Sequence, residues 1–251
     1  MKREDVTEDE LGRYGLRIAQ PAAGYRFSLD ALLLAEFVDA PDAARFADLG
    51  TGCGVIPLIL CRRFPAATAV GIESNDAMAG LARDNVAGNG LADRVGIVCD
   101  DVVNLKRLFP VSIFDGVTAN PPFRTPESGR LSPRAGRDTA RHESTARIDD
   151  FLAAAKYLVR PGGRIWFVYH PDRLAEFIHA AGAMKLCLLR LRMVHGRSDA
   201  PARIFLAELA KGRKGATQVL PPLIVFGPDG EYTPELRAML GRDETTKQSN
   251  E

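Results

Sequence analysis

The chain has few residues that could build a metal or disulfide centre. Its 251 residues include four cysteines and four histidines, and neither type clusters at ligand spacing. No two cysteines form a CxxC motif, and they are scattered through apolar stretches, which is typical of reduced core thiols in a cytosolic protein. We therefore expect no metal site, no disulfide framework and a cytoplasmic location.

Long apolar runs and an excess of one charge sign are missing as well. No run reaches the roughly 18 residues that a membrane-spanning helix needs, and the charged start Met1-Lys2-Arg3-Glu4-Asp5 lacks the apolar core of a signal peptide. We therefore expect no membrane partner. Lys plus Arg number 33 and Asp plus Glu 32, a formal net charge of +1, so a nucleic-acid partner would have to meet a local basic patch.

What the chain does have is enough apolar sequence for one α/β domain. With 46% hydrophobic residues it can bury a sizeable core. We predict an N-terminal arm over 1–24, with a short hairpin in it, a single domain over 25–240 and a polar tail over 241–251. Strands and helices alternate in the domain until two β-rich runs close it. This order predicts a mainly parallel sheet with helices on both faces.

The strand 44–49 ends in a glycine-rich turn, Gly50-Thr51-Gly52-Cys53-Gly54, and a helix follows. Glycines at alternate positions let the backbone bend tightly and approach a ligand closely. The spacing differs from the GxGxxG of dinucleotide enzymes, and no Gly-Lys-Ser/Thr follows as in a phosphate loop. Asp48 stands just before the turn, where its carboxylate would repel a pyrophosphate but suit a cationic or amine-bearing ligand.

The next two strands also end in acidic residues. Glu73 follows the turn by about 20 residues, the position at which nucleoside-binding sheets place a carboxylate on the ribose hydroxyls. The third strand ends in Asp100 and Asp101, one of which could accept a hydrogen bond from an adenine amine. The alternatives are a solvated strand-end charge for Glu73 and, for the aspartates, an N-cap of the short helix near 102–108.

The fourth strand, 114–119, stops at Asn120-Pro121-Pro122-Phe123. Proline cannot donate to a sheet ladder, so the chain must leave the sheet there. It leaves with an amide side chain, the Pro121 carbonyl and an aromatic ring held stiffly together, which suits a flat, amine-bearing ring. A plain proline turn is the alternative. Because parallel sheets bind ligands at the carboxyl ends of their strands, one pocket can hold the four residues Asp48, Glu73, Asp100 and Asn120.

Two further segments flank these strand ends. Residues 124–147 hold six arginines against three acidic residues and are broken by glycine and proline. Loops of this length are usually functional or disordered, and arginines beside a base pocket indicate phosphate contacts; a solvated flexible loop is the alternative. Ser28 and Asp30 precede a leucine-rich helix, where either could serve as the N-cap or contact a ligand.

Together these residues resemble the class I methyltransferases that use S-adenosylmethionine. The run from Asp48 to Gly54 resembles their cofactor loop, Glu73 their ribose carboxylate and Asp100 their adenine contact. The Asn-Pro-Pro-Phe stretch is similar to the catalytic motif of members that methylate amines. The resemblance covers residues 25–210 and implies a Rossmann-like fold, with a mainly parallel seven-stranded sheet and a terminal antiparallel hairpin.

A narrower resemblance is to the bacterial tRNA adenine-N6 methyltransferases, which modify the adenine beside the anticodon of a valine tRNA. It rests on the stretch from Gly24 to Ala35, on Asn-Pro-Pro-Phe and on Ala140-Arg141-His142-Glu143. It implies that Phe27, Ser28 and Asp30 close over the methionine end of the cofactor. It also implies that RNA, and tRNA in particular, is the substrate, which the arginine-rich loop 124–147 would contact.

In such a site the Asn120 side-chain oxygen and the Pro121 carbonyl would each accept one N–H of an adenine amine, and Phe123 would stack on the base. Rival interpretations stay open. The same motif serves methylation of glutamine amides in release factors, by enzymes that usually carry an extra N-terminal helical domain. Guanine-amine methyltransferases of ribosomal RNA, many with a duplicated domain, are a second rival. A non-catalytic RNA-binding protein that retains the fold is an alternative of another class.

Overall fold

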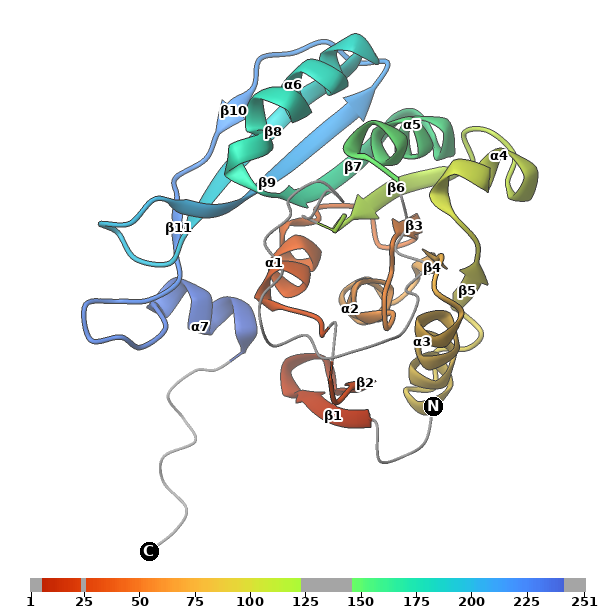
Figure 1. Ribbon diagram of the computed structural model, residues 1–251, viewed down its shortest axis with the longest axis horizontal. Coiled ribbons are helices and arrows are strands. Elements are labelled where there is room, and N and C mark those ends of the chain that lie inside the picture. The colour runs from red at the N-terminus through yellow and green to blue at the C-terminus, as the bar shows by residue number, and fades with distance from the viewer. Residues whose placement is uncertain (1–5, 24–25, 123–145, 242–251) are drawn as a thin grey trace, which may run out of the picture.

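The computed structural model describes residues 6–23, 26–122 and 146–241, and Figure 1 shows its layers. Within these residues one sheet of nine strands has the order β10-β8-β9-β7-β6-β3-β4-β5, with β11 also paired to β8. Its strands are β3 (Arg45–Leu49), β4 (Thr68–Glu73), β5 (Val95–Cys99), β6 (Phe114–Ala119), β7 (Val159–Tyr169), β8 (Leu186–His195), β9 (Ala202–Lys211), β10 (Gln218–Val219) and β11 (Leu223–Ile224).

The sheet is mainly parallel. β5, β4, β3, β6 and β7 are parallel neighbours, whereas β9 lies antiparallel between β7 and β8. The predicted parallel sheet with an antiparallel hairpin is thus confirmed. Beyond the expected strands, β10 and β11 pair in parallel with β8. Each has two residues, too few for a periodic pattern to reveal in the sequence.

Helices cover both faces of the sheet, as predicted (Figure 1). On one face lie α1 (Leu29–Phe37), α2 (Val55–Arg63), α3 (Asp76–Gly88) and α7 (Pro234–Leu240). On the other lie α4 (Leu105–Leu108), α5 (Ile148–Leu158) and α6 (Leu174–Ala183). Three short 3-10 helices join them: η2 (Gly12–Tyr14), η3 (Val102–Asn104) and η4 (Pro171–Arg173). None of the helices in the described ranges is long and apolar enough to cross a membrane.

β7 begins earlier than the sequence indicates. The stretch Pro161-Gly162-Gly163 is typical of a turn before a strand over 164–169, but the strand already runs from Val159. Its pairing with β6 shifts between Val159 and Arg164, so the Pro-Gly-Gly segment is an irregularity within one strand. Glycine and proline mark bulges as well as turns, which is why the pattern alone favoured a turn.

β1 (Val6–Leu11) and β2 (Leu16–Pro21) form a separate antiparallel hairpin, in the stretch where one was expected. Alternate residues of β2 are buried, and Leu16 and Ile18 are fully enclosed in the core that α1, α2 and α3 share. Figure 1 shows the hairpin beside α2 and α3. A two-stranded hairpin is marginally stable alone in water, so its order depends on this packing.

Candidate functional site

Three of the strand ends identified in the sequence lie at one level of the sheet edge. Leu49 of β3 pairs with Ile72 of β4 on one side and with Ala119 of β6 on the other. The next residue of each strand therefore emerges beside the next residue of its neighbour. Those next residues are Gly50, Glu73 and Asn120.

The fourth strand end extends the same edge. Cys99 of β5 pairs with Glu73, so Asp100 follows one residue further along. Neighbouring strands lie about 4.8 Å apart, so the edge from β6 to β5 spans about 15 Å over three spacings. The strand ends thus lie on one edge of the sheet, as predicted, and this edge is long rather than compact.

The glycine-rich turn is held over this edge by β4. The N–H groups of Gly50 and Thr51 both donate to the Ile72 carbonyl oxygen at 2.9 Å. The Gly52 N–H donates to Glu73 Oε2, also at 2.9 Å. The turn therefore has a backbone anchor and a side-chain anchor on the same strand, which fixes the direction of its amides.

Close packing holds the turn from two further sides. Gly54 has a φ of +84°, and a Cβ there would lie 3.3 Å from the Cβ of Ala82 on α3. Beneath the turn, a Cβ on Gly71 of β4 would lie 2.7 Å from Thr51 Cγ2. Both positions need glycine, the first for its backbone conformation and both for close approach.

Glu73 is fixed by backbone donors rather than left as a solvated strand-end charge. Its Oε1 accepts the Asn75 N–H at 2.9 Å, and its Oε2 accepts the Gly52 N–H. The residue is half-buried. A carboxylate has about four acceptor sites, so two backbone bonds leave capacity for hydroxyl donors of a ligand.

The two aspartates after β5 have different partners. Asp101 is the N-cap of η3, and its Oδ1 accepts the Val103 N–H at 3.1 Å. Asp100 Oδ1 accepts from the Asp101 N–H and from Asn104 Nδ2, each at 2.7 Å. No hydrogen bond from the described residues reaches Asp100 Oδ2. The N-cap alternative therefore applies to Asp101, and Asp100 has the oxygen that a ligand could use.

Asp48 lies beneath the edge and is only 1% exposed. Its Oδ2 accepts from Thr51 Oγ1 at 2.6 Å and its Oδ1 from Thr118 Oγ1 at 2.7 Å. The carboxylate thus joins the glycine-rich turn to β6, two residues before Asn120. Thr118 is the one hydroxyl in a buried, apolar strand, and no motif in the sequence indicates its role. Direct contact of Asp48 with a ligand stays a prediction.

Burial raises the pKa of Asp48 from its ordinary value of 3.8 to about 7; bonds from Thr51 and Thr118 oppose the rise, and the Glu73 charge adds to it. The unfolded chain ionises this group near pH 4. The folded protein holds the Asp48 proton more tightly than the unfolded chain, because the folded-state pKa is the higher one. The contribution of this proton to the free energy of unfolding is therefore complete below pH 4 and is lost as the pH rises through 7.

We therefore expect Asp48→Asn to become more stable relative to the wild type as the pH rises. The rise of the pKa to about 7 corresponds to a free energy on the order of 4 kcal/mol between pH 4 and pH 8. Urea unfolding of both proteins across this range would measure it, and the difference between the two curves cancels the titration of other groups. A difference that does not change with pH would contradict the expectation.

The segment before α1 only partly follows the sequence prediction. Ser28 occupies the N-cap position, but its side chain makes no capping hydrogen bond and interacts with Asp30 instead. Burial raises the pKa of Asp30, and the hydrogen bond with Ser28 opposes that rise. Phe27 is half-buried against the core of the α1 face. Ser28 is therefore the N-cap by position, but it does not make the hydrogen bond by which an N-cap side chain stabilises a helix.

The Asn-Pro-Pro-Phe stretch leaves the sheet where predicted, since the pairing of β6 with both neighbours ends at Ala119. Asn120 is half-buried, Pro121 buried and Pro122 exposed. Phe123 and the loop up to residue 145 lie outside the described residues, so their roles stay predictions. Of the six arginines of the loop, only Arg147 is described. Its N–H donates to Asp150 Oδ2 at 2.8 Å at the start of α5.

The chain is similar to known methyltransferases. A family model, the methyltransferase small domain, matches residues 27–185. A tRNA1(Val) (adenine(37)-N6)-methyltransferase from Porphyromonas gingivalis is 32% identical over 229 residues, 87% of this chain and 88% of the relative. A protein of the same name from Vibrio parahaemolyticus is 33% identical over 192 residues, 75% of this chain and 77% of the relative.

Solved structures show the same fold. A predicted O-methyltransferase from Agrobacterium tumefaciens has a TM-score of 0.69 at 24% identity, covering 85% of this chain and 96% of that one. TrmN from Thermus thermophilus has a TM-score of 0.53 at 23% identity, covering 72% of this chain and 48% of that one. At these identities the likeness concerns the fold and not the substrate. The family match, which spans the strand ends described above, shows that the chain belongs to the methyltransferase small domain family of class I, S-adenosylmethionine-dependent methyltransferases.

Proposed function

We propose that this methyltransferase acts on N6 of an adenine in tRNA, with adenine 37 of a valine tRNA as the target. The observation that carries the proposal is the position of Asn120 and Pro121. They leave the sheet beside the glycine-rich turn and at the level of Glu73. The names of relatives that are 32% and 33% identical support this choice of substrate.

The residues at the edge fit S-adenosylmethionine. Glu73, with its carboxylate fixed by two backbone amides, would hold the ribose hydroxyls, and Asp100 Oδ2 would accept from the adenine amine. The turn at Gly52 and Gly54 brings bare backbone to the same edge. Ser28 and Asp30 would contact the methionine end. When bound, the cofactor supplies an electrophilic methyl group on a sulfonium.

The chain's own contribution is to orient the amine that receives this methyl. An adenine amine is a poor nucleophile because its lone pair is delocalised into the ring. Asn120 Oδ1 and the Pro121 carbonyl oxygen would each accept one of its N–H groups and so direct the lone pair. Pro121 is buried, and the proline that follows it restricts its ψ, which holds that carbonyl in place. Such positioning can contribute roughly 7–11 kcal/mol.

The target base has to leave its stack to reach this edge, which is easier in a single-stranded loop than in a duplex. Phe123 would stack on the base, a contact worth about 1–3 kcal/mol in single-strand binders. The arginines of residues 124–147 would contact phosphates.

The test is methyl transfer from radiolabelled S-adenosylmethionine to total tRNA from cells that lack this protein, followed by nucleoside mass spectrometry. We expect N6-methyladenosine. A valine tRNA transcript should reproduce it, and a transcript with guanine at position 37 should not. Transfer to ribosomal guanine or to a protein glutamine instead would assign one of the rival substrates. Cofactor binding without transfer to any of these would favour a non-catalytic RNA-binding protein.

A further inference from the structure

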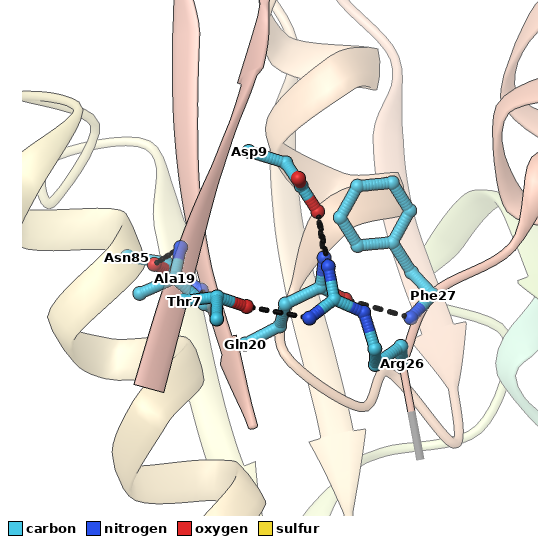
Figure 2. A network of polar contacts seen from close by, with 7 residues as sticks. All are labelled: Thr7, Asp9, Ala19, Gln20, Arg26, Phe27 and Asn85. Atoms are coloured by element: carbon cyan, nitrogen blue, oxygen red, sulfur yellow. Dashed lines mark hydrogen bonds and ion pairs between the residues drawn. The ribbon is translucent and has the colours of Figure 1, made fainter. Parts of the chain in front are cut away.

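We propose that the N-terminal hairpin is a working part of the cofactor site, and that Asn85 of α3 is the positioning residue that connects the two. The proposal rests on the use of S-adenosylmethionine at the glycine-rich turn. It concerns residues that neither the sequence motifs nor the strand ends indicate. Figure 2 shows the polar network from which it is built.

Asn85 is a buried amide, 4% exposed, near the C-terminal end of α3. Its Oδ1 accepts the Ala19 N–H at 2.8 Å, and its Nδ2 donates to the Ala19 carbonyl oxygen at 2.8 Å. The side chain thus pairs with β2 as a neighbouring strand would (Figure 2). The second amide proton goes to the Cys53 carbonyl oxygen at 2.9 Å, which lies within the glycine-rich turn.

Only one orientation of the Asn85 amide allows all three hydrogen bonds. A flipped side chain would set its NH₂ group against the Ala19 N–H and its oxygen against two carbonyls. The amide is therefore fixed, and it ties the edge of the hairpin to Cys53. Cys53 lies between Gly52, which donates to Glu73, and Gly54, which packs on α3.

Asn89, the C-cap residue of α3, makes an equivalent pair of bonds to β2. Its Oδ1 accepts the Arg17 N–H at 2.9 Å and its Nδ2 donates to the Arg17 carbonyl oxygen at 2.7 Å. Its remaining amide proton goes to the Asn85 carbonyl oxygen at 2.8 Å, within the same helix. Two asparagines therefore attach the hairpin to α3, but only Asn85 reaches the glycine-rich turn.

A second connection runs from the hairpin to the segment before α1. Gln20 of β2, 1% exposed, accepts the Phe27 N–H on its Oε1 at 3.1 Å and donates to Asp9 on β1. Arg26 Nη2 lies 2.9 Å from Asp9 Oδ2. Figure 2 shows these side chains converging on Arg26 and Phe27. The hairpin thus holds both the glycine-rich turn and the segment assigned to the methionine end of the cofactor.

The chemistry of these contacts favours a positioning role over a packing role. A buried amide is costly unless its hydrogen bonds are made. An apolar side chain at 85 could pack on β2, but it would leave the N–H and the carbonyl of Ala19 without these partners and the buried Cys53 carbonyl without this donor. Asn85 therefore fixes the turn whose Gly52 amide meets Glu73.

Asn85→Ala and Asn89→Ala form a matched pair for the test. Each removes two bonds to the backbone of β2, and only the first also removes the bond to Cys53. By calorimetry with the full chain we expect S-adenosylmethionine to bind Asn85→Ala about tenfold more weakly, and Asn89→Ala less than about twofold more weakly, than the wild type. In kinetics, Asn85→Ala should raise the KM for the cofactor and retain kcat at saturation.

Wild-type affinity in Asn85→Ala would overturn the proposal. Equal weakening in both variants would overturn the role assigned to Asn85, because the loss would then come from loosening the hairpin and not from the bond to Cys53. A wild-type protein that binds no S-adenosylmethionine would refute the cofactor assignment along with the proposal, and calorimetry of that protein alone reveals this case.

Gln20→Met tests the second connection independently, and it applies even where Asn85→Ala fails to fold. Methionine keeps the volume of glutamine and removes the acceptor of the Phe27 N–H. We expect faster amide hydrogen exchange at Phe27 and about threefold weaker cofactor binding, as for the loss of one neutral hydrogen bond. Faster exchange with unchanged affinity would show that the hairpin does not act on the site.

Discussion

Asn120→Ala is expected to lower methyl transfer on the order of a thousandfold, while the affinity for S-adenosylmethionine stays within about twofold of the wild type. Asn120 emerges from a strand that is paired on both sides up to Ala119, so its amide has a rigid base. In the proposed site it contacts the substrate amine and not the cofactor. Its loss should therefore be visible in turnover and absent from cofactor binding.

Single-turnover transfer to tRNA, together with calorimetry of the cofactor, would measure both effects. Asn120→Gln is the informative companion, because it retains the amide and displaces it by one methylene group. We expect it to remain strongly impaired, since orientation is what Asn120 supplies. Asn89→Ala, an asparagine variant remote from the sheet edge, should keep full turnover. Normal transfer by Asn120→Ala, or loss of cofactor binding, would refute the assignment.

Glu73→Gln is expected to weaken the binding of S-adenosylmethionine by about 100-fold, because hydrogen bonds to a charged group contribute about 1.5–3 kcal/mol. The substitution keeps the length of the side chain. It replaces one carboxylate oxygen with a donor that faces either the Gly52 or the Asn75 N–H, each of which now donates at 2.9 Å. The side chain thus loses one of the two backbone bonds that fix it, and the ribose loses a charged acceptor.

Asp76→Asn provides a charge-matched control for Glu73→Gln. Asp76 is exposed in the first turn of α3, so the variant removes the same charge a short distance away and leaves both backbone bonds to Glu73 intact. We expect its cofactor affinity to stay within about threefold of the wild type, as for an exposed charge. Equal losses in the two variants would show that only the net charge matters, and wild-type affinity in Glu73→Gln would refute its role.

The sequence was most informative where local rules and long-range geometry agree. Glycines, carboxylates and an Asn-Pro pair each end an apolar run, and a parallel sheet brings such ends together whatever their separation in the chain. For this reason the edge that carries Glu73, Asp100 and Asn120 could be predicted without a structure. The sequence also holds the signals of α7, which we did not predict: Thr233 is its N-cap, Pro234 its first residue and Gly241 its C-cap.

Residues whose partners lie on other elements could not be predicted. Asn85 and Gln20 are polar residues in amphipathic patterns, and only the docking of the hairpin on α3 makes them buried connectors. Asp48 is a similar case. Its position just before the glycine-rich turn indicated a carboxylate that faces a ligand, whereas in the structure Thr51 and Thr118 donate hydrogen bonds to it from two directions. The N-cap role of Asp101, as opposed to Asp100, depends on where η3 begins, and sequence patterns place such boundaries poorly.

The attachment of the hairpin to α3 has a consequence for synthesis on the ribosome. Ala19 and Asn85 are 66 positions apart, so at about 5–20 residues per second the ribosome needs roughly 3–13 s to add the partner after the hairpin has been made. During that interval β1 and β2 lack this attachment, and a hairpin alone is marginally stable. We infer that this early-made segment becomes ordered late, after α3 has emerged, and that chaperones and proteases have access to it until then.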